Sequence, residues 1–216
     1  MVIANNIAEI KKEIGSATLV AVSKTQPVEL LMQAYKAGQR DFGENKIQEM
    51  VLKQQQMPDD VRWHMIGHVQ TNKVRQMASF VHLIHGVDSE KLLAGINSQS
   101  QKHDRIIDCL LQVHIASEDS KFGLNEDELS EIISNLEAGR YSSVRVRGLM
   151  GMATFTDDRN QIQREFTHLR TLYDRYASVR DFDTLSMGMS GDFDIAVKCG
   201  STMVRVGSRI FGARNY

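Results

Sequence analysis

Short apolar runs alternate with longer amphipathic stretches along almost the whole chain. The runs are rich in valine, isoleucine and leucine, which is typical of strands buried on both faces of a parallel sheet. The stretches between them carry apolar residues at intervals of three and four, which is typical of helices. The predicted strands cover residues 19–25, 41–44, 62–67, 81–88, 106–115, 144–153, 184–188 and 203–207.

Eight alternating strand–helix units predict an α/β protein, a single (β/α)8 TIM barrel formed by one domain over residues 1–216. The amphipathic stretch at 3–14 predicts an additional N-terminal helix, which covers the place where a last helix is missing. A doubly wound open sheet is the alternative, since it has the same alternation of strands and helices.

Composition narrows the class of protein further. Charged residues make up 25% of the chain and the net charge is -1, so no basic surface for nucleic acid is expected. No apolar run has the length of a membrane span, and the first residues do not resemble a signal peptide. Cys109 and Cys199 lie in apolar segments without a C-x-x-C spacing. We therefore expect a soluble cytoplasmic protein without disulfides.

The first predicted strand ends in a lysine. Val20, Val22 and Lys24 share one face of it by the period of two. A desolvated ammonium group is costly unless it is paired, deprotonated or chemically consumed, and such lysines form Schiff bases. The alternative is a side chain that extends into solvent at the strand end.

Small and polar residues follow other strands, at the barrel end where such folds place their sites. The second strand leads into Glu44 and Asn45. The turns at 190–191 (Ser-Gly) and 207–208 (Gly-Ser) follow the seventh and eighth strands, the recurring phosphate site of these barrels. Alternatively, the first turn only caps a helix and the second only relieves a bend.

Arg205 shares a strand face with Gly207 and is expected to point into the barrel mouth. Its permanent charge, placed against a heteroaromatic nitrogen, keeps that nitrogen unprotonated. An ion pair with Asp41 or Asp88 is the alternative. A lysine imine, a phosphate cradle and a cation for a ring nitrogen together describe a pyridoxal phosphate site.

Motifs along nearly the whole chain carry a family resemblance. They are AVSKTQP at 21–27, DFGENKIQE at 41–49, WHMIGHVQTNK at 63–73, HGVDS at 85–89, SKFG at 120–123, GLMGMA at 148–153, SMGMSGDF at 186–193 and STMVRVGSRIFGARNY at 201–216. In them the chain resembles the pyridoxal phosphate homeostasis proteins (the YggS/PROSC-like family), which are relatives of the alanine racemase barrel domain.

The resemblance implies that the cofactor is pyridoxal 5'-phosphate (PLP). It implies Lys24 as the covalent Schiff-base lysine, Arg205 at the pyridine nitrogen, Ser190, Gly207 and Ser208 at the phosphate, and Asn45 and Met189 nearby. Gly86 stands where the family has serine, and Ser208 where threonine is common; a serine keeps the hydroxyl.

Two uses of the cofactor follow from these residues. Arg205 makes the pyridine ring of the cofactor a poor electron sink, and no tyrosine is predicted to face Lys24 as a second base. The leading hypothesis is therefore a non-catalytic carrier that buffers PLP and passes it to apo-enzymes. A racemase-like PLP enzyme is the alternative, and an imine-forming barrel enzyme without cofactor is a third. The chain ends at Tyr216, without the racemase dimerisation domain, which favours a monomer.

Three weaker signals in the sequence concern a helix cap, two histidines and the methionines. Asn45 and Gln48 have the spacing of an ordinary capping box. His64 and His68 have a metal-ligand spacing, but no carboxylate or cysteine cluster accompanies them in the sequence, so core or capping roles and no metal are expected. The eleven methionines are expected to fill the barrel.

Overall fold

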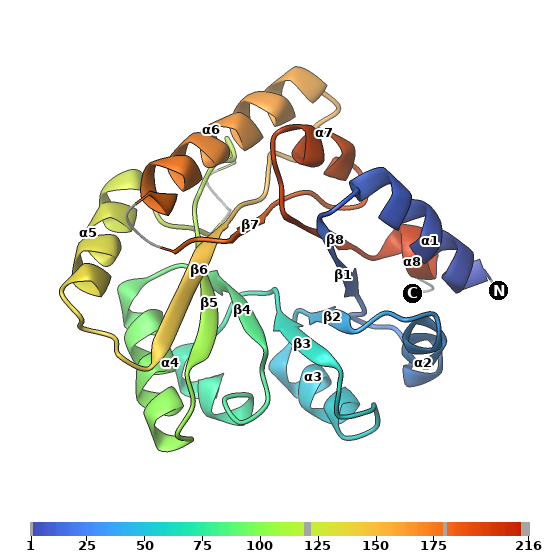
Figure 1. Cartoon of the computed structure of the whole chain (residues 1–216), viewed down its shortest axis with the longest axis horizontal. Coiled ribbons are helices and arrows are strands. Elements are labelled where there is room, and N and C mark those ends of the chain that lie inside the picture. The colour runs from blue at the N-terminus through green and yellow to red at the C-terminus, as the bar shows by residue number, and fades with distance from the viewer. Residues whose placement is uncertain (1, 119–121, 179–180, 213–216) are drawn as a thin grey trace.

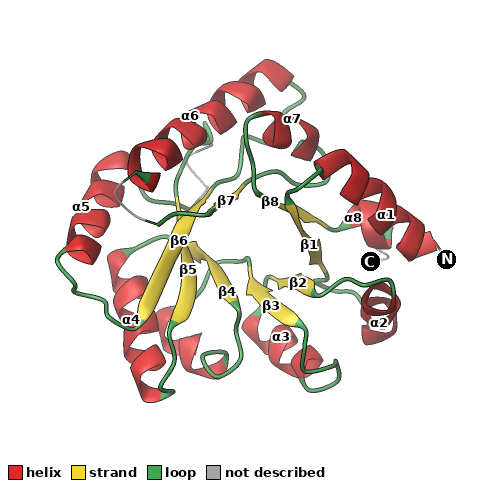
Figure 2. Cartoon of the chain, viewed as in Figure 1, coloured by secondary structure: helices red, strands yellow, loops and turns green. Residues whose placement is uncertain are grey.

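Eight parallel strands close into a barrel, in sequence order from β1 to β8, with β8 paired to β1. The computed structural model describes residues 2–118, 122–178 and 181–212. The strands form the central ring and the helices surround it (Figures 1 and 2). The predicted barrel is therefore confirmed, and the open sheet is excluded because its two edge strands would not pair. Residues 120–121 and 213–216, in two of the quoted motifs, lie outside the described residues.

The elements alternate as the pattern predicts. The strands are β1 (Thr18–Val22), β2 (Asp41–Glu44), β3 (Arg62–Met65), β4 (Leu83–Val87), β5 (Ile107–Gln112), β6 (Val144–Met150), β7 (Thr184–Ser186) and β8 (Met203–Val206). The helices are α1 (Val2–Ile14), α2 (Val28–Lys36), α3 (Ile47–Gln54), the 3-10 helix η1 (Thr71–Gln76), α4 (Glu90–Lys102), α5 (Glu126–Glu137), α6 (Arg159–Ala177), α7 (Phe193–Lys198) and α8 (Ser208–Phe211).

The N-terminal helix is confirmed, but the last helix is not missing. A single turn, α8, follows β8, and α1 packs beside it (Figure 1). The amide of Asn6 donates to the carbonyl of Ile210 at 3.0 Å, and Arg209 forms an ion pair with Glu13 at 2.6 Å. Because α8 is so short, α1 supplies most of the apolar cover that the ring needs there.

The interior of the ring is only partly apolar. Val20, Leu83, Leu110, Met150 and Met203 form a small cluster of their own, separate from the large core in which the helices pack. Two of its five members are methionines, but five other buried methionines lie in the large core, so the expectation that methionines fill the barrel is confirmed for a minority of them only. Other inward positions are polar, among them His64, His85, Ser186 and Arg205, which are buried.

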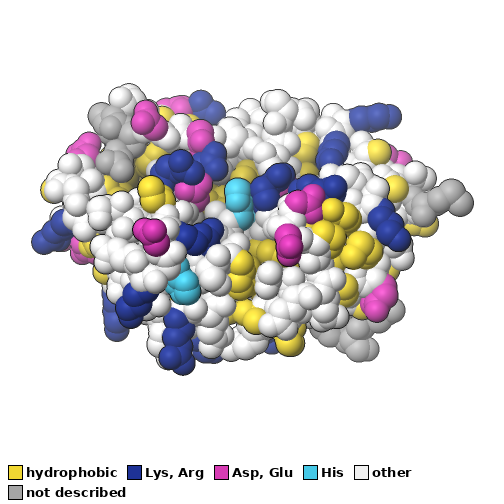
Figure 3. All heavy atoms as spheres, turned by 60° about the horizontal axis from the view of Figure 1, so that its bottom comes forward, with side chains coloured by type: hydrophobic (Ala, Val, Ile, Leu, Met, Phe, Trp, Pro, Cys, Tyr) yellow, Lys and Arg dark blue, Asp and Glu magenta, His cyan; other side chains and the backbone are white. Residues whose placement is uncertain are grey.

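The surface mixes charges of both signs. On the face shown in Figure 3, basic and acidic side chains are interspersed, with histidine among them. No helix among the described residues is long and apolar enough to cross a membrane.

Candidate functional site

Lys24 lies at the carboxyl ends of three neighbouring strands, β8, β1 and β2. The strand β1 stops at Val22, so Lys24 is in the following turn rather than in the strand, and it is partly buried. Val22 pairs with Gly43 of β2, so Lys24 and Asn45 each lie two residues past a paired position. On the other side, a Cβ added to Gly207 would lie 3.2 Å from the Cβ of Val22. The fold therefore brings Lys24, Asn45 and Gly207 to one edge of the ring.

A buried ion pair ends the strand early and anchors the turn. The hydroxyl of Ser23 donates to Glu44 at 2.5 Å, and the ammonium group of Lys53 donates to Glu44 at 2.8 Å and to the carbonyl of Ser23 at 2.7 Å. Glu44 thus points between the sheet and α3, not into the mouth where the strand-end pattern placed it. Its role is to hold the residue before Lys24.

The two small-residue turns meet as predicted. The backbone N–H of Gly207 donates to the hydroxyl of Ser190 at 3.3 Å. The N-cap of α7 is Asp192, so Ser190 does not cap that helix, contrary to the alternative interpretation. Met189 donates its N–H to Asp192 at 2.6 Å and is 37% exposed, and the exposed Ser208 opens α8. Together they form one polar rim with backbone N–H groups and hydroxyls.

Asn45 does not cap α3. The N-cap of that helix is Lys46, without a side-chain hydrogen bond, so the predicted Asn45–Gln48 capping box is wrong. The side-chain oxygen of Asn45 is instead buried and has no hydrogen-bond partner among the described residues. One carboxylate oxygen of Glu44 is in the same state, but Glu44 points away from the mouth, so the oxygen of Asn45 is the one beside Lys24 that a ligand can reach.

Arg205 lies inside the ring and is 3% exposed. Its guanidinium donates to the carbonyl of Ser186 at 2.9 Å, to the hydroxyl of Ser186 at 2.6 Å and to the carbonyl of Gly151 at 3.1 Å. Burial lowers the pKa of Arg205 to about 10, so it stays charged at neutral pH. The carboxylates considered as its partners bond elsewhere, Asp41 to Arg62 and His64, and Asp88 to His68.

A chain of hydrogen bonds links Arg205 to the opposite end of the barrel. The hydroxyl of Ser186 lies 3.1 Å from Nδ1 of His85, Nε2 of His85 lies 3.0 Å from Nδ1 of His64, and Nε2 of His64 lies 3.0 Å from Asp41. Arginine only donates and a carboxylate only accepts. With neutral imidazoles, every proton between these ends therefore points toward Asp41, and every member of the chain is satisfied.

Burial sets the charges along this chain. It lowers the pKa of His85 well below that of an exposed histidine, and the positive charge of Arg205 acts in the same direction. Burial alone would raise the pKa of Asp41, but hydrogen bonds from His64 and Arg62 and the charge of Arg62 hold it below its usual range. The interior thus has a charged group at each end and a neutral imidazole at His85.

This chain of hydrogen bonds is not evident from the sequence. His64 has the expected core role, but a carboxylate does accompany it, since pairing of β2 with β3 brings Asp41 beside it. The only signal in the sequence was alternation: His64, His85 and Ser186 occupy inward positions of β3, β4 and β7. Alternation identifies the face of each strand, but it does not identify which inward side chains meet across the ring.

We expect His85→Leu to destabilise the fold. The substitution leaves His64 and Ser186 each without one buried partner, at about 1–3 kcal/mol for each unsatisfied group. The free energy of unfolding, measured by urea denaturation, should fall by several times the change in His103→Leu, an exposed histidine at the end of α4. Equal changes in the two variants would show that the chain adds nothing to stability.

The comparisons with known proteins agree with this architecture. The model of the alanine racemase N-terminal domain matches residues 2–215. A pyridoxal phosphate homeostasis protein of Vibrio alginolyticus is 42% identical over 207 residues, which cover 93% of this chain and 88% of that protein. The protein of the same name in Escherichia coli strain K12 is 35% identical, with 99% and 97% covered.

Solved structures extend the likeness to three dimensions. PipY of Synechococcus elongatus PCC7942, with PLP bound, superposes with a TM-score of 0.87 at 33% identity and covers 97% of this chain and 100% of its own. Alanine racemase from Streptomyces coelicolor A3(2) has a TM-score of 0.77 at 15% identity, with 58% of that enzyme covered, which shows a shared fold alone. This chain therefore belongs to the alanine racemase N-terminal domain family, and within it to the pyridoxal phosphate homeostasis proteins.

Proposed function

We propose that this protein binds PLP reversibly through Lys24 and acts as a carrier without catalytic turnover. When bound, PLP supplies an aldehyde that condenses with a lysine amine to give a coloured imine. Ser190, Gly207 and Ser208 hold its phosphate, and Arg205 faces its ring nitrogen. Met189 and Asn45 complete the surroundings. The observation that carries the proposal is a buried guanidinium inside the ring at the mouth that Lys24 borders.

The residues present fit such a group. The buried oxygen of Asn45 is an acceptor without a donor, which a hydroxyl group on the ligand would satisfy. Ser190 and Gly207 already lie within hydrogen-bond distance of each other, so the two phosphate-binding turns are positioned before any ligand arrives. A Cβ at Gly207 would lie 3.1 Å from the carbonyl oxygen of Val22 and 3.2 Å from its Cβ, so this turn packs tightly against the end of β1.

Arg205 supports a carrier rather than an enzyme. A charged guanidinium donates a hydrogen bond to a pyridine nitrogen and does not protonate it. The pyridine ring therefore draws electrons only weakly from a bound amino acid. The guanidinium is also held by the carbonyls of Ser186 and Gly151, which keeps it from turning away. Transamination and decarboxylation, which need a strong electron sink, are disfavoured.

A racemase also needs a base on each face of the substrate carbon. Of the described tyrosines, Tyr35 and Tyr176 lie near the carboxyl ends of α2 and α6, Tyr173 donates to the carbonyl of Phe182, and Tyr141 donates to Glu90 just before β6. Tyr35, Tyr173 and Tyr176 lie beside segments that lead into the amino ends of strands, the end of the barrel opposite Lys24. The hydroxyl of Tyr141 is held by Glu90, at the start of a helix outside the barrel. None of the four is placed to serve as the second base, and Tyr216 lies outside the described residues.

A direct assay separates the carrier from the racemase. We expect the PLP-loaded protein to leave L-alanine and other L-amino acids unchanged when chiral chromatography follows them for hours. Catalytic racemisation by the wild type, lost in Lys24→Ala, would overturn the carrier proposal while leaving PLP binding intact.

Transfer to apo-enzymes is the second part of the proposal. Phe155 is 96% exposed and Phe122 is 57% exposed, on the loops that follow β6 and β5 at this mouth. Exposed aromatic residues are common at protein interfaces. Direct transfer predicts that the rate of cofactor loss rises with the concentration of an apo-enzyme. A rate independent of that concentration would instead show release of free PLP.

A further inference from the structure

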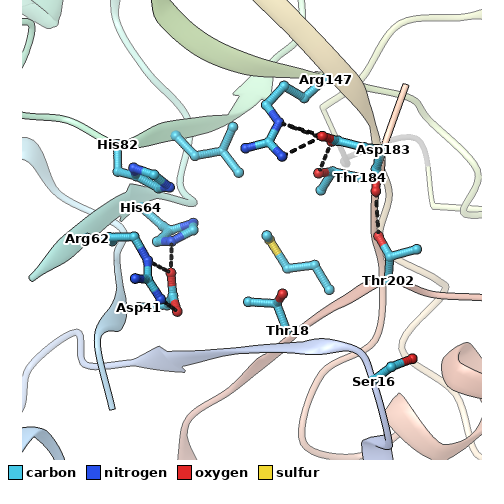
Figure 4. A pocket seen from close by; sticks show the side chains of 12 residues that line it. Ser16, Thr18, Asp41, Arg62, His64, His82, Arg147, Asp183, Thr184 and Thr202 are labelled. Carbon is cyan, nitrogen blue, oxygen red and sulfur yellow. Dashed lines mark hydrogen bonds and ion pairs between the residues drawn. The ribbon is translucent and has the colours of Figure 1, made fainter. Parts of the chain in front are cut away.

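A second pocket lies at the other mouth of the barrel. It has a volume of about 350 Å³ and is lined by residues at the starts of the strands, among them Thr18, Asp41, Arg62, His82 and Thr184 (Figure 4). It is therefore separated from Lys24 by the length of the strands. The proposed carrier function makes no use of it.

Three potential metal ligands converge in this pocket. One carboxylate oxygen of Asp41 and one ring nitrogen each of His64 and His82 all lie within 4.8 Å of one another. Figure 4 shows the two imidazoles next to each other on the same side of the pocket as Asp41, and their ring centres lie 5.4 Å apart. Zinc takes histidine nitrogen and carboxylate oxygen at about 2.0–2.2 Å, so a small inward shift of His82 completes the geometry.

Both ring nitrogens of His64 face fixed partners. One ring nitrogen faces Asp41 at 3.0 Å, and the other faces Nε2 of His85 at 3.0 Å. Ligating histidines characteristically donate their other N–H to a fixed partner, which sets the tautomer and the ring orientation. In the metal-free chain Nε2 of His64 carries the proton that faces Asp41. Coordination through Nε2 therefore moves this proton to Nδ1 and reverses the hydrogen bonds from His64 to His85 and from His85 to Ser186, whose hydroxyl can accept.

Arg62 competes for the same carboxylate. Its guanidinium donates to the two oxygens of Asp41 at 2.7 and 2.5 Å. The side chain of Arg62 is 47% exposed, so it can move into solvent without leaving a buried charge. A cation bound to Asp41 must displace this arginine, which lowers the affinity of the site for the cation. Substitution of Arg62 therefore tests the site.

We propose that Asp41, His64 and His82 bind a divalent transition-metal ion of the zinc class at the amino-terminal mouth, with water in the open position. Two imidazoles with one carboxylate favour zinc and its neighbours over magnesium or calcium. This site does not depend on the carrier function, since it shares no residue with the PLP site.

The test is titration of the full-length chain with Zn²⁺ in a calorimeter, in a buffer that does not chelate metals. We expect one Zn²⁺ ion to bind in this pocket. Its affinity should fall at least about tenfold in His82→Ala and in Asp41→Asn. His82 is only partly buried, and its ring contacts among the described residues involve His64 alone, so His82→Ala should fold normally. Circular dichroism checks this.

Two variants sharpen the result. Arg62→Gln frees Asp41 and removes a positive charge, so it should tighten binding about tenfold. His68→Ala is the matched control. His68 pairs with Asp88 at 2.9 Å at the opposite mouth, so its loss should leave Zn²⁺ binding unchanged. Absence of binding, equal affinity in folded His82→Ala, loss of binding in His68→Ala, or weaker binding in Arg62→Gln would each overturn the proposal.

Discussion

Lys24→Ala will abolish the visible absorbance of the PLP-loaded protein and the covalent label left by borohydride reduction. The amine of Lys24 is the proposed point of attachment at this mouth. A lysine amine condenses with an aldehyde to form an imine, and alanine has no amine to do so. The measurement is an absorbance spectrum after incubation with PLP and desalting, followed by mass spectrometry of the reduced peptide.

Lys46→Ala is the matched control. Lys46 is exposed and lies next to Asn45 at the same mouth, so the variant loses the same charge without removing the proposed amine. It should keep the full visible absorbance and the borohydride label on residue 24. A label on Lys46, or a yellow Lys24→Ala protein with a covalent adduct, would contradict attachment at Lys24.

The fold was predictable because the patterns that specify its strands and helices are local in the sequence. A strand buried on both faces must be apolar, a helix that packs on one face must be amphipathic, and the alternation of the two leaves few topologies. The limits of β1 were not predictable in the same way. Ser23 and Lys24 read as a continuation of the strand, yet Ser23 bonds to Glu44 and Lys53, which are 21 and 30 positions further along.

The candidate site was predictable as a set of strand ends, because parallel strands deliver their carboxyl ends to one mouth. The sequence also allowed an ion pair for Arg205 and a capping box for Asn45. The structure excludes the second, since α3 begins after Lys46, and gives Arg205 carbonyl and hydroxyl partners. These outcomes depend on which inward side chains meet across the ring, a matter of register that a single sequence does not express.

Lys53→Met should lower the free energy of unfolding by about 3–5 kcal/mol. Lys53 is buried against Glu44, which is fully buried and for which burial already raises the pKa of the carboxyl. Removing the ammonium group leaves that carboxylate without its charge partner. Urea denaturation measures the loss.

The same substitution should weaken PLP binding, because Lys53 anchors both sides of Lys24. Its ammonium group bonds to the carbonyl of Ser23 and to Glu49, and Glu49 accepts the N–H of Thr25 at 2.6 Å. Thr25 has a φ of 63°, a conformation that a threonine keeps only when its surroundings hold it.

The double variant Lys53→Met/Glu44→Leu separates the two effects. Replacing both charges removes the buried unpaired carboxylate, so more than half of the lost stability should return. The anchors on Ser23 and Glu49 remain absent, so PLP binding should stay weak. Recovery of binding together with stability would show that the turn at Lys24 needs a stable barrel and not these bonds. Recovery of neither would show that Lys53 stabilises the barrel through its bonds to the turn and not by neutralising Glu44.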